Sequence, residues 1–176
     1  MDAIKANYSG FPTRQHLHRI PVRLPSERPV NYFVTQCCFG RRVVFDVAYP
    51  VQLALSSLIK IAAKLHWRIP LICFMPDHVH MFALPQEHRE QALSSLMRDW
   101  KSSSTQTLHQ GGISGAIWQR EFFDHLLRSD ESMGNEWAYV VQNPVRAGLC
   151  AKNADYRYSG TPEEILARLL WKGANG

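Results

Sequence analysis

Apolar residues recur along this chain with two different periods, and the changes of period mark the expected elements. Runs rich in aromatic and β-branched residues are typical of strands and occupy residues 31–39, 69–75, 79–84 and 118–127. Apolar stripes at spacings of three and four residues are typical of amphipathic helices. They follow Pro50 and recur over residues 87–107, and a third helix is expected from about Ser129.

The order of these elements is β-α-β-β-α-β followed by a helix. This order is typical of a ferredoxin-like α+β fold, in which an antiparallel sheet carries helices packed on one face. Pro76-Asp77 predicts a tight turn between the second and third strands. The segment Thr161-Pro162-Glu163-Glu164 predicts a capping box at the start of a short terminal helix. We expect the chain to fold without this last helix.

The length of 176 residues suits one domain with two appendages. Residues 1–30 contain four prolines, which exclude a long helix or a central strand, so we expect an extended N-terminal arm. Residues 31–150 carry the expected sheet and form the main domain. Residues 151–176 form a C-terminal tail with the short helix.

The positive charge of the chain is concentrated in its first quarter. Residues 1–45 hold seven basic and two acidic side chains, whereas the remaining residues hold 13 of each, so the net charge of +5 lies entirely in this segment. Two interpretations stay open at this point. The segment is either a solvated arm or an arm that contacts the phosphates of a nucleic acid.

Membrane and secreted classes are not indicated by the sequence. No apolar run approaches the roughly 20 residues of a membrane span, and the N-terminus lacks the apolar segment of a secretory signal. The four cysteines lack the spacing of a disulfide framework. We therefore expect a reduced, cytoplasmic protein without membrane contact.

Two histidines one residue apart are the first candidates for chemistry. His78 and His80 fall in an expected strand, so both side chains point to the same face, where neutral imidazoles are a ready pair of metal ligands. The alternative is a pair of hydrogen-bonded core residues. A structural zinc site would need four closed ligands, and no CxxC or second histidine pair supplies them. A catalytic site with open positions fits better.

Tyr139 and Asn143 are the second pair of candidates. If they lie on one helix, their spacing places them on the same face, and the amide oxygen could be a third metal ligand beside the phenol. The alternative is that Asn143 caps a new short turn, because a residue before proline is pushed out of the helical region. A metal beside a tyrosine suggests phosphodiester chemistry, in which the phenol attacks a phosphate.

Three segments together resemble a known family. The segment Met75-Pro76-Asp77-His78-Val79-His80 resembles the HUH motif (histidine, hydrophobic residue, histidine) of single-tyrosine transposases. Residues 118–125 and 139–149 narrow the resemblance to the REP-associated tyrosine transposases, a subgroup found with repetitive extragenic palindromes in bacteria. The resemblance extends from about Leu24 to Ser159.

The resemblance implies that residues 31–150 are a catalytic domain with the ferredoxin-like HUH fold. His78, His80 and Asn143 would hold Mg²⁺ or Mn²⁺, and Tyr139 would be the nucleophile. The implied substrate is single-stranded DNA folded into hairpins at repetitive extragenic palindromes, which would be cleaved and rejoined through a 5′-phosphotyrosine. Relatives include monomers and swapped dimers, so both remain open here.

Basic side chains are expected to contact DNA phosphates. The resemblance also implies that the N-terminal region recognises a short base sequence beside the hairpin. The candidates are Arg14, Arg19, Arg23, Arg41, Arg42, Arg98, Lys101 and Arg120. Two other function classes remain. One is a hairpin-binding protein that has lost cleavage, and the other is an RNA-binding ferredoxin-like module whose sheet displays aromatic residues.

Overall fold

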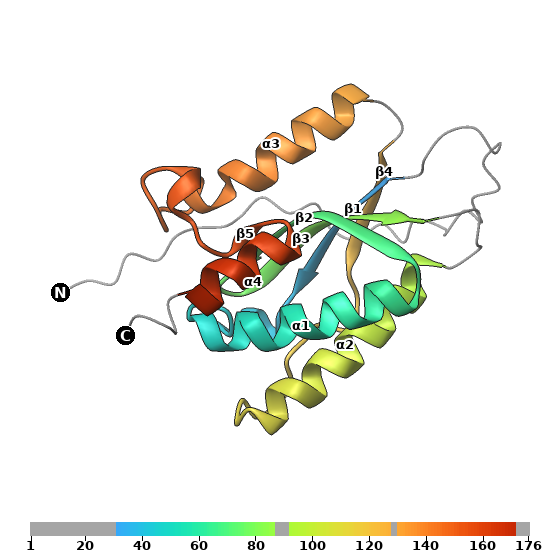
Figure 1. Ribbon diagram of the computed structural model, residues 1–176, viewed down its shortest axis with the longest axis vertical. Coiled ribbons are helices and arrows are strands. Elements are labelled where there is room, and N and C mark those ends of the chain that lie inside the picture. Colours follow the sequence, from blue (N-terminus) through green and yellow to red (C-terminus); the bar gives the residue numbers. More distant parts are fainter. Residues whose placement is uncertain (1–30, 87–91, 128–129, 172–176) are drawn as a thin grey trace.

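The computed structural model describes residues 31–86, 92–127 and 130–171 (Figure 1). The predicted N-terminal arm, including Arg14, Arg19 and Arg23, lies outside the described residues. No helix within the described ranges is long and apolar enough to cross a membrane.

A single antiparallel sheet organises the described residues. Its strands are β1 (Asn31–Cys37), β2 (Trp67–Met75), β3 (His78–Pro85), β4 (Phe123–Leu127) and β5 (Ser159–Gly160). They lie in the order β4-β1-β3-β2-β5, and every neighbouring pair is antiparallel. The strands preceding β5 have the order expected of a ferredoxin-like α+β fold, which is thereby confirmed.

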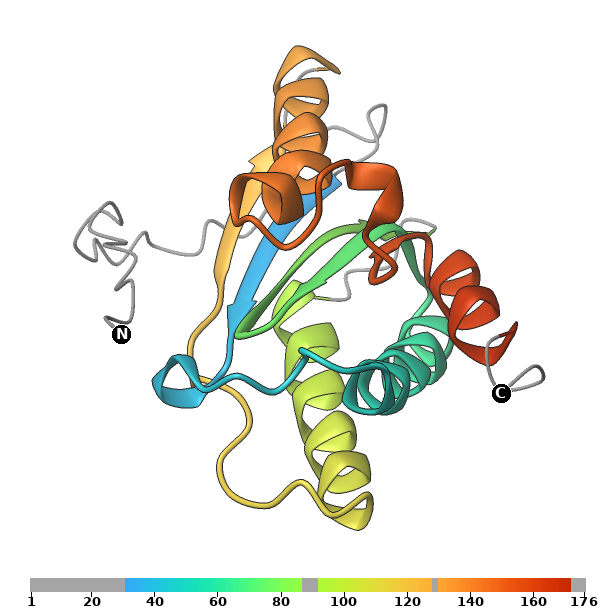
Figure 2. The same ribbon diagram turned by 90° about the vertical axis from the view of Figure 1, so that its left-hand side faces the viewer.

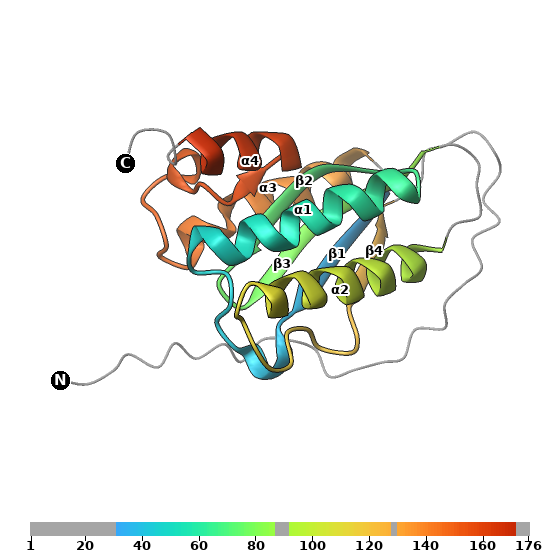
Figure 3. The same cartoon turned by 60° about the horizontal axis from the view of Figure 1, so that its bottom comes forward.

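The helices occupy both sides of this sheet. They are α1 (Ala48–Lys64), α2 (Leu93–Gln110), α3 (Asp130–Arg146) and α4 (Pro162–Trp171), with short 3₁₀ turns at η1 (Phe39–Arg41) and η2 (Asn153–Asp155). The two helices of the βαββαβ unit, α1 and α2, lie side by side on one face, as predicted (Figure 3). The additional helix α3 lies across the opposite face (Figures 1 and 2).

Strand alternation divides the core between these two faces. Val79 and Met81 of β3 are fully buried toward α1 and α2, where Leu58 and Trp100 are also fully buried. The indole of Trp100 donates a hydrogen bond of 3.0 Å to the Ala54 carbonyl, which ties α2 to α1. The alternate residues of β3 therefore face α3.

The predicted hairpin between β2 and β3 is present, and backbone hydrogen bonds from the segment after β1 hold its turn. The turn at Pro76-Asp77 joins Met75 to His78, which pair directly across the strands. The Pro76 carbonyl accepts hydrogen bonds from the backbone N–H groups of Val44 and Phe45, and the Asp77 carbonyl accepts one from Cys38. The start of β3 is thus fixed by the segment that follows β1.

Two predicted elements have different boundaries in the structure. The helix expected over 87–107 begins at Leu93, because Ala92 has an extended backbone (φ −60°, ψ 134°), and residues 87–91 lie outside the described ranges. The strand expected over 118–127 is restricted to β4. Residues 118–122 form a loop that makes one isolated bridge, between Trp118 and Cys38.

The terminal helix α4 is capped as predicted but packs more deeply than expected. The Thr161 hydroxyl accepts from the Glu164 N–H at 3.2 Å, and the Glu164 carboxylate accepts from the Thr161 N–H at 2.9 Å. Ile165 is fully buried and Leu169 is buried, and α4 contacts α1 and β2. The helix is therefore part of the core. Folding of the chain without it stays a prediction.

Candidate active site on the α3 face of the sheet

His78 and His80 lie at the start of β3 on the face covered by α3. Their Nε2 atoms are 3.0 Å apart, and His80 is 4% exposed. The side-chain amide of Asn143, which comes from α3, lies 2.9 Å from the same Nε2 of His80. Strand alternation and the packing of α3 thus bring three side-chain groups to one point, as the sequence predicted.

The other ring nitrogen of each histidine has its own partner. Nδ1 of His80 is 2.8 Å from the Thr35 hydroxyl, because Thr35 and His80 are directly opposite in the β1–β3 register. Nδ1 of His78 is 2.6 Å from the Asp77 carboxylate. The second oxygen of Asp77 accepts from Nε of Arg41 at 2.9 Å. Both imidazoles are therefore oriented with Nε2 toward Asn143.

Burial and neighbouring charges determine the protonation states of His80 and Asp77. Burial, and then the charge on His78, lowers the pKa of His80 to about 3, so its imidazole is neutral near pH 7. Burial alone would raise the pKa of Asp77, but the hydrogen bond and charge of His78, with Arg41, hold that pKa below its ordinary value. A carboxylate can only accept, so His78 carries its proton on Nδ1.

This arrangement suits a divalent cation. With Nδ1 of His78 protonated, the neutral form of that ring aims an Nε2 lone pair at the Nε2 lone pair of His80, and a cation between them relieves the repulsion. At the observed Nε2–Nε2 distance of 3.0 Å, both imidazoles would be able to hold one ion. Rotation of the Asn143 amide by 180° would present its oxygen there.

The third ligand would be an amide rather than an ionised group. No cluster of three His, Cys, Asp or Glu side chains able to hold a metal occurs among residues 31–86, 92–127 and 130–171. Two imidazoles and one amide leave coordination positions open, which is the arrangement of a catalytic site rather than of a closed structural one.

Tyr139 lies beside the histidine pair on α3. Its ring is 5.6 Å from the ring of His80 and 6.4 Å from that of Phe33, both edge-on, and the side chain is 37% exposed. The helix continues through Pro144 to Arg146, so Asn143 is one turn beyond Tyr139 on the same face. The alternative in which Asn143 caps a new turn is therefore wrong.

Arg146 extends the same stripe of α3 by one further turn. Its guanidinium carbon lies 5.5 Å from the centroid of the Tyr139 ring, within the range of a cation–π contact. Gly148, in a left-handed conformation with φ +70°, follows the end of the helix. The stripe Tyr139, Asn143 and Arg146 thus places a phenol and an amide beside His80, with an exposed cation next to the phenol.

The sequence of residues 28–142 matches the model of a protein family described as "Transposase IS200 like". This match covers more than half of the chain. The chain belongs to the IS200-like transposase family. The histidine pair and the tyrosine described above therefore belong to a member of this family, and the resemblance seen in the sequence is confirmed.

Relatives of this chain point to one subgroup of the family. A Haemophilus influenzae protein, provisionally named a REP-associated tyrosine transposase, is 29% identical over 116 residues, which are 58% of this chain and 65% of the relative. The REP-associated tyrosine transposase of Escherichia coli K12 is 26% identical over 126 residues, which are 69% of this chain and 73% of the relative.

A solved structure supports the fold of this chain. It is a REP-associated tyrosine transposase bound to a REP hairpin, with a TM-score of 0.63 and 24% identity over 74% of this chain and 75% of that one. At this identity the match supports the shared fold alone.

Four residues of the candidate site were not identified from the sequence. Asp77 was part of the histidine motif, but its role depends on the 2.6 Å contact to His78. Arg146 could have been found, since it lies seven residues after Tyr139 on a helix. Thr35 and Phe33 gave no signal, because their contacts depend on the strand register.

Most of the predicted DNA contacts that the structure describes have protein partners. Arg41 binds Asp77, Arg42 donates to the Ser114 carbonyl at 2.6 Å, and Arg98 pairs with Asp99 at 2.8 Å. The Arg120 side chain is 97% exposed, with Glu121 at 4.0 Å. These residues are spread over several elements, and their contacts to DNA remain predictions.

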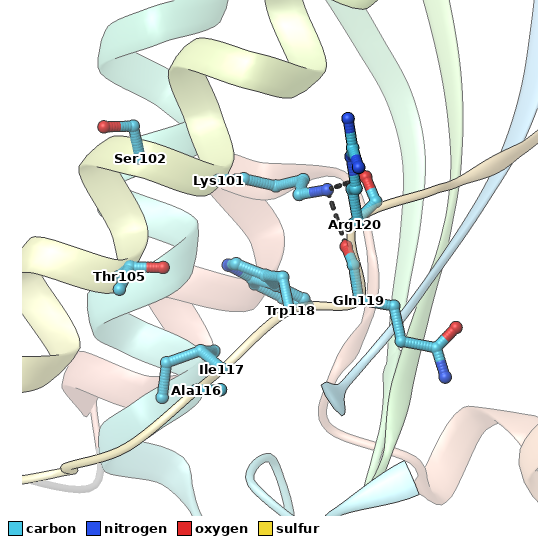
Figure 4. Close-up of a pocket in the computed structure, with 8 residues that line it drawn as sticks. All are labelled: Lys101, Ser102, Thr105, Ala116, Ile117, Trp118, Gln119 and Arg120. Carbon is cyan, nitrogen blue, oxygen red and sulfur yellow. Dashed lines mark hydrogen bonds between the residues drawn. The ribbon is translucent and has the colours of Figure 1, made fainter. Parts of the chain in front are cut away.

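Lys101 has a structural role in addition to any contact with DNA. Its ammonium donates to the carbonyls of Gln119 and Arg120 at 2.6 and 2.7 Å, which fastens the loop before β4 to α2 (Figure 4). Burial lowers the pKa of Lys101, although Glu121 partly opposes this. The lysine borders a groove of about 390 Å³ whose other lining residues are Ser102, Thr105, Ala116, Ile117, Trp118, Gln119 and Arg120.

Proposed function

We propose that this protein cleaves and rejoins single-stranded DNA at hairpins formed by repetitive extragenic palindromes, with Tyr139 as the nucleophile. The observation that carries the proposal is the packing of the Tyr139 ring against His80, beside the point where the two Nε2 atoms and the Asn143 amide meet. A phenol next to a set of open-site metal ligands is suited to attack on a phosphodiester.

The metal proposed for this site is Mg²⁺ or Mn²⁺, held by Nε2 of His78, Nε2 of His80 and the side-chain oxygen of Asn143. When bound, such an ion supplies Lewis-acid polarisation of a phosphate oxygen. Thr35 and Asp77 hold the two imidazoles in the required orientation through their Nδ1 atoms.

The chemical step is assigned to side chains of α3. The Tyr139 oxygen attacks the scissile phosphorus and forms the P–O bond of a 5′-phosphotyrosine, while the bond to the 3′ oxygen breaks and that oxygen takes a proton from solvent to become a free 3′-OH. The phenol proton passes to solvent, to which the side chain is 37% exposed. Arg146, next to the Tyr139 ring, stabilises the negative charge that develops on the phosphate. Attack by a 3′-OH on the phosphotyrosine rejoins the strand.

The substrate class is supported by family membership, by the names of the relatives and by charge. The IS200-like family and the REP hairpin bound to the similar solved structure both favour hairpin DNA. The surplus of basic residues in the first 45 positions favours a polyanionic partner.

An oligonucleotide cleavage assay tests the reaction. End-labelled single-stranded hairpins, drawn from repeats near the gene, are incubated with the protein and Mg²⁺, Mn²⁺ or EDTA. We expect a metal-dependent covalent protein–DNA band that is absent in Tyr139→Phe and present in Tyr49→Phe, a matched exposed tyrosine on α1. Hairpin binding without a covalent band under any metal would instead identify a binding protein that has lost cleavage.

One copy of the chain is proposed to suffice for this site. Tyr139 contacts His80 of the same chain, so nucleophile and ligands come together without a partner. Mixing Tyr139→Phe with His78→Ala protein tests this arrangement. We expect no cleavage in the mixture, whereas restored cleavage would show that α3 is exchanged between two copies.

A further inference from the structure

Two aromatic side chains are exposed on the edge strand β4, on the face that carries Tyr139. Phe123 is 54% exposed and His125 is also exposed. β4 is the outermost strand, next to β1 (Figure 2). A large aromatic residue exposed beside a nucleophile is a feature of binding sites rather than of core packing.

The strand register places both side chains in line with the active site. Phe123 is directly opposite Thr35, which in turn is opposite His80, so the three share one face of the sheet. His125 is opposite Phe33, and their rings stack at 6.5 Å with an angle of 10°. Phe33 also contacts the Tyr139 ring. Ring contacts through the buried Phe33 therefore link His125 to the nucleophile, and Phe123 lies on the same face of the sheet.

The spacing of these two side chains suits an extended nucleic-acid strand. Residues two positions apart on a strand are separated by about 6.8 Å. This is twice the roughly 3.4 Å between successive nucleotides of a stacked DNA strand. Two rings at this separation can each take one base of a strand whose bases are no longer stacked on each other.

We propose that Phe123 and His125 form a stacking site for unpaired bases next to the scissile phosphate. This inference rests on the proposed function, because it assumes that DNA is bound at Tyr139. The occupant is assigned as nucleobases because His125 is linked to Tyr139 through the Phe33 ring, and because the cation of Arg146 lies next to Tyr139, where a phosphate would bind. Sheet aromatics serve the same purpose in RNA-binding modules of related architecture.

A fluorescence experiment on the full-length protein tests the stacking. The probe is a DNA hairpin with a short unpaired flank that carries 2-aminopurine at each flank position in turn, in EDTA to prevent cleavage. Stacking on an aromatic ring quenches this base. We expect quenching at one or two flank positions, its loss in Phe123→Leu and His125→Ala, and its retention in Phe123→Trp.

Affinity measurements separate stacking from other effects. Loss of one stacked base should weaken binding of the flanked hairpin by about 5- to 150-fold. Binding of the same hairpin without its flank should be unchanged in Phe123→Leu. Trp171→Ala, which removes an exposed aromatic residue on α4, is the control and should leave both affinities unchanged. Circular dichroism of each variant verifies folding.

The outcomes distinguish this inference from the function on which it rests. If the protein cleaves hairpins but quenching persists in both Phe123→Leu and His125→Ala, the stacking site is wrong and the transposase function stands. If quenching is lost while affinity for the hairpin without its flank also falls, β4 contributes to the fold and not specifically to binding of the flank, and the inference is again overturned. If wild-type protein binds no hairpin and forms no covalent adduct, both proposals fail.

Discussion

The Asp77 carboxylate and Nδ1 of His78 are 2.6 Å apart, and this contact determines which nitrogen of His78 is available to a ligand. Arg41 holds the other carboxylate oxygen at 2.9 Å, so the carboxylate cannot turn away from the imidazole. Arg41 itself has a left-handed backbone, with φ 57°, which is unusual for a residue other than glycine. The conformation of η1 is thereby connected to the orientation of a proposed metal ligand.

Asp77→Asn should weaken metal binding. The amide carries no charge to stabilise the Nδ1 proton, so the Nε2 lone pair of His78 becomes a poorer ligand. We expect Mn²⁺ affinity, measured by isothermal titration calorimetry without DNA, to fall by about 10- to 100-fold. Asp46→Asn, on an exposed loop, serves as the control and should bind as wild type does. Equal affinities for both variants would contradict the role of Asp77.

The metal-free protein should lose stability in acid because of His80. Its pKa is about 3 in the folded state, below the ordinary value of 6.5, so the unfolded chain binds the extra proton between these pH values. The free energy of unfolding should therefore decrease as pH falls from about 6.5 to about 3, by at most about 1.4 kcal/mol per pH unit from this group. Urea titrations in EDTA measure the slope.

His80→Gln provides the comparison for this slope, because glutamine does not titrate. The difference between wild type and variant isolates the contribution of His80 to the free energy of unfolding. Carboxylates with a lowered pKa, such as Asp77, also lower this free energy as the pH falls, but they do so in both proteins. Parallel pH dependences for the two proteins would show that His80 is not kept neutral by burial.

Lys101 and Arg120 should respond differently to removal of their charges. Arg120 is almost fully exposed, so Arg120→Ala should leave the thermal midpoint unchanged. If Arg120 contacts one phosphate, the variant should also reduce the slope of log affinity for single-stranded DNA against log salt concentration by about 0.7. Lys101→Met removes the ammonium that donates to the Gln119 and Arg120 carbonyls and should lower the thermal midpoint, although the Gln119 carbonyl keeps the Gln36 amide as a donor at 3.1 Å. A salt slope lowered only in Lys101→Met would reverse these assignments.

The packing of α4 predicts a strong contrast between two of its apolar residues. Ile165 is fully buried, so Ile165→Ala should lower the free energy of unfolding by about 2–5 kcal/mol. Leu170 is 59% exposed, and Leu170→Ala should change it by less than about 0.5 kcal/mol. Urea denaturation measures both, and equal losses would show that α4 is not docked as described.

Local rules were sufficient for the parts of the structure that depend on neighbours in sequence. Alternation in a strand correctly placed His78 and His80 on one face, and the spacing of Tyr139 and Asn143 correctly placed them on one face of α3. The capping box at Thr161 formed as predicted. Each of these features requires only a period or a local hydrogen bond.

Features that depend on tertiary contacts could not be predicted in this way. Thr35 reaches His80 only through the register of two strands far apart in sequence. The start of α2 was misplaced because the expected apolar stripe did not reveal the extended backbone of Ala92. Lys101 was predicted only as a contact to DNA phosphates, and its bonds to two carbonyls of the loop before β4 depend on how that loop folds back onto α2.

The stripe on α3 also has a mechanical consequence. Tyr139, Asn143 and Arg146 are carried by one helix, whereas His78 and His80 belong to the hydrogen-bonded sheet. After strand cleavage the DNA end would be tethered to that helix. Any displacement of α3 would move the tethered DNA end, the Asn143 amide and the Arg146 cation away from the sheet together. Strand transfer would then stop, while the DNA end stays covalently bound to Tyr139.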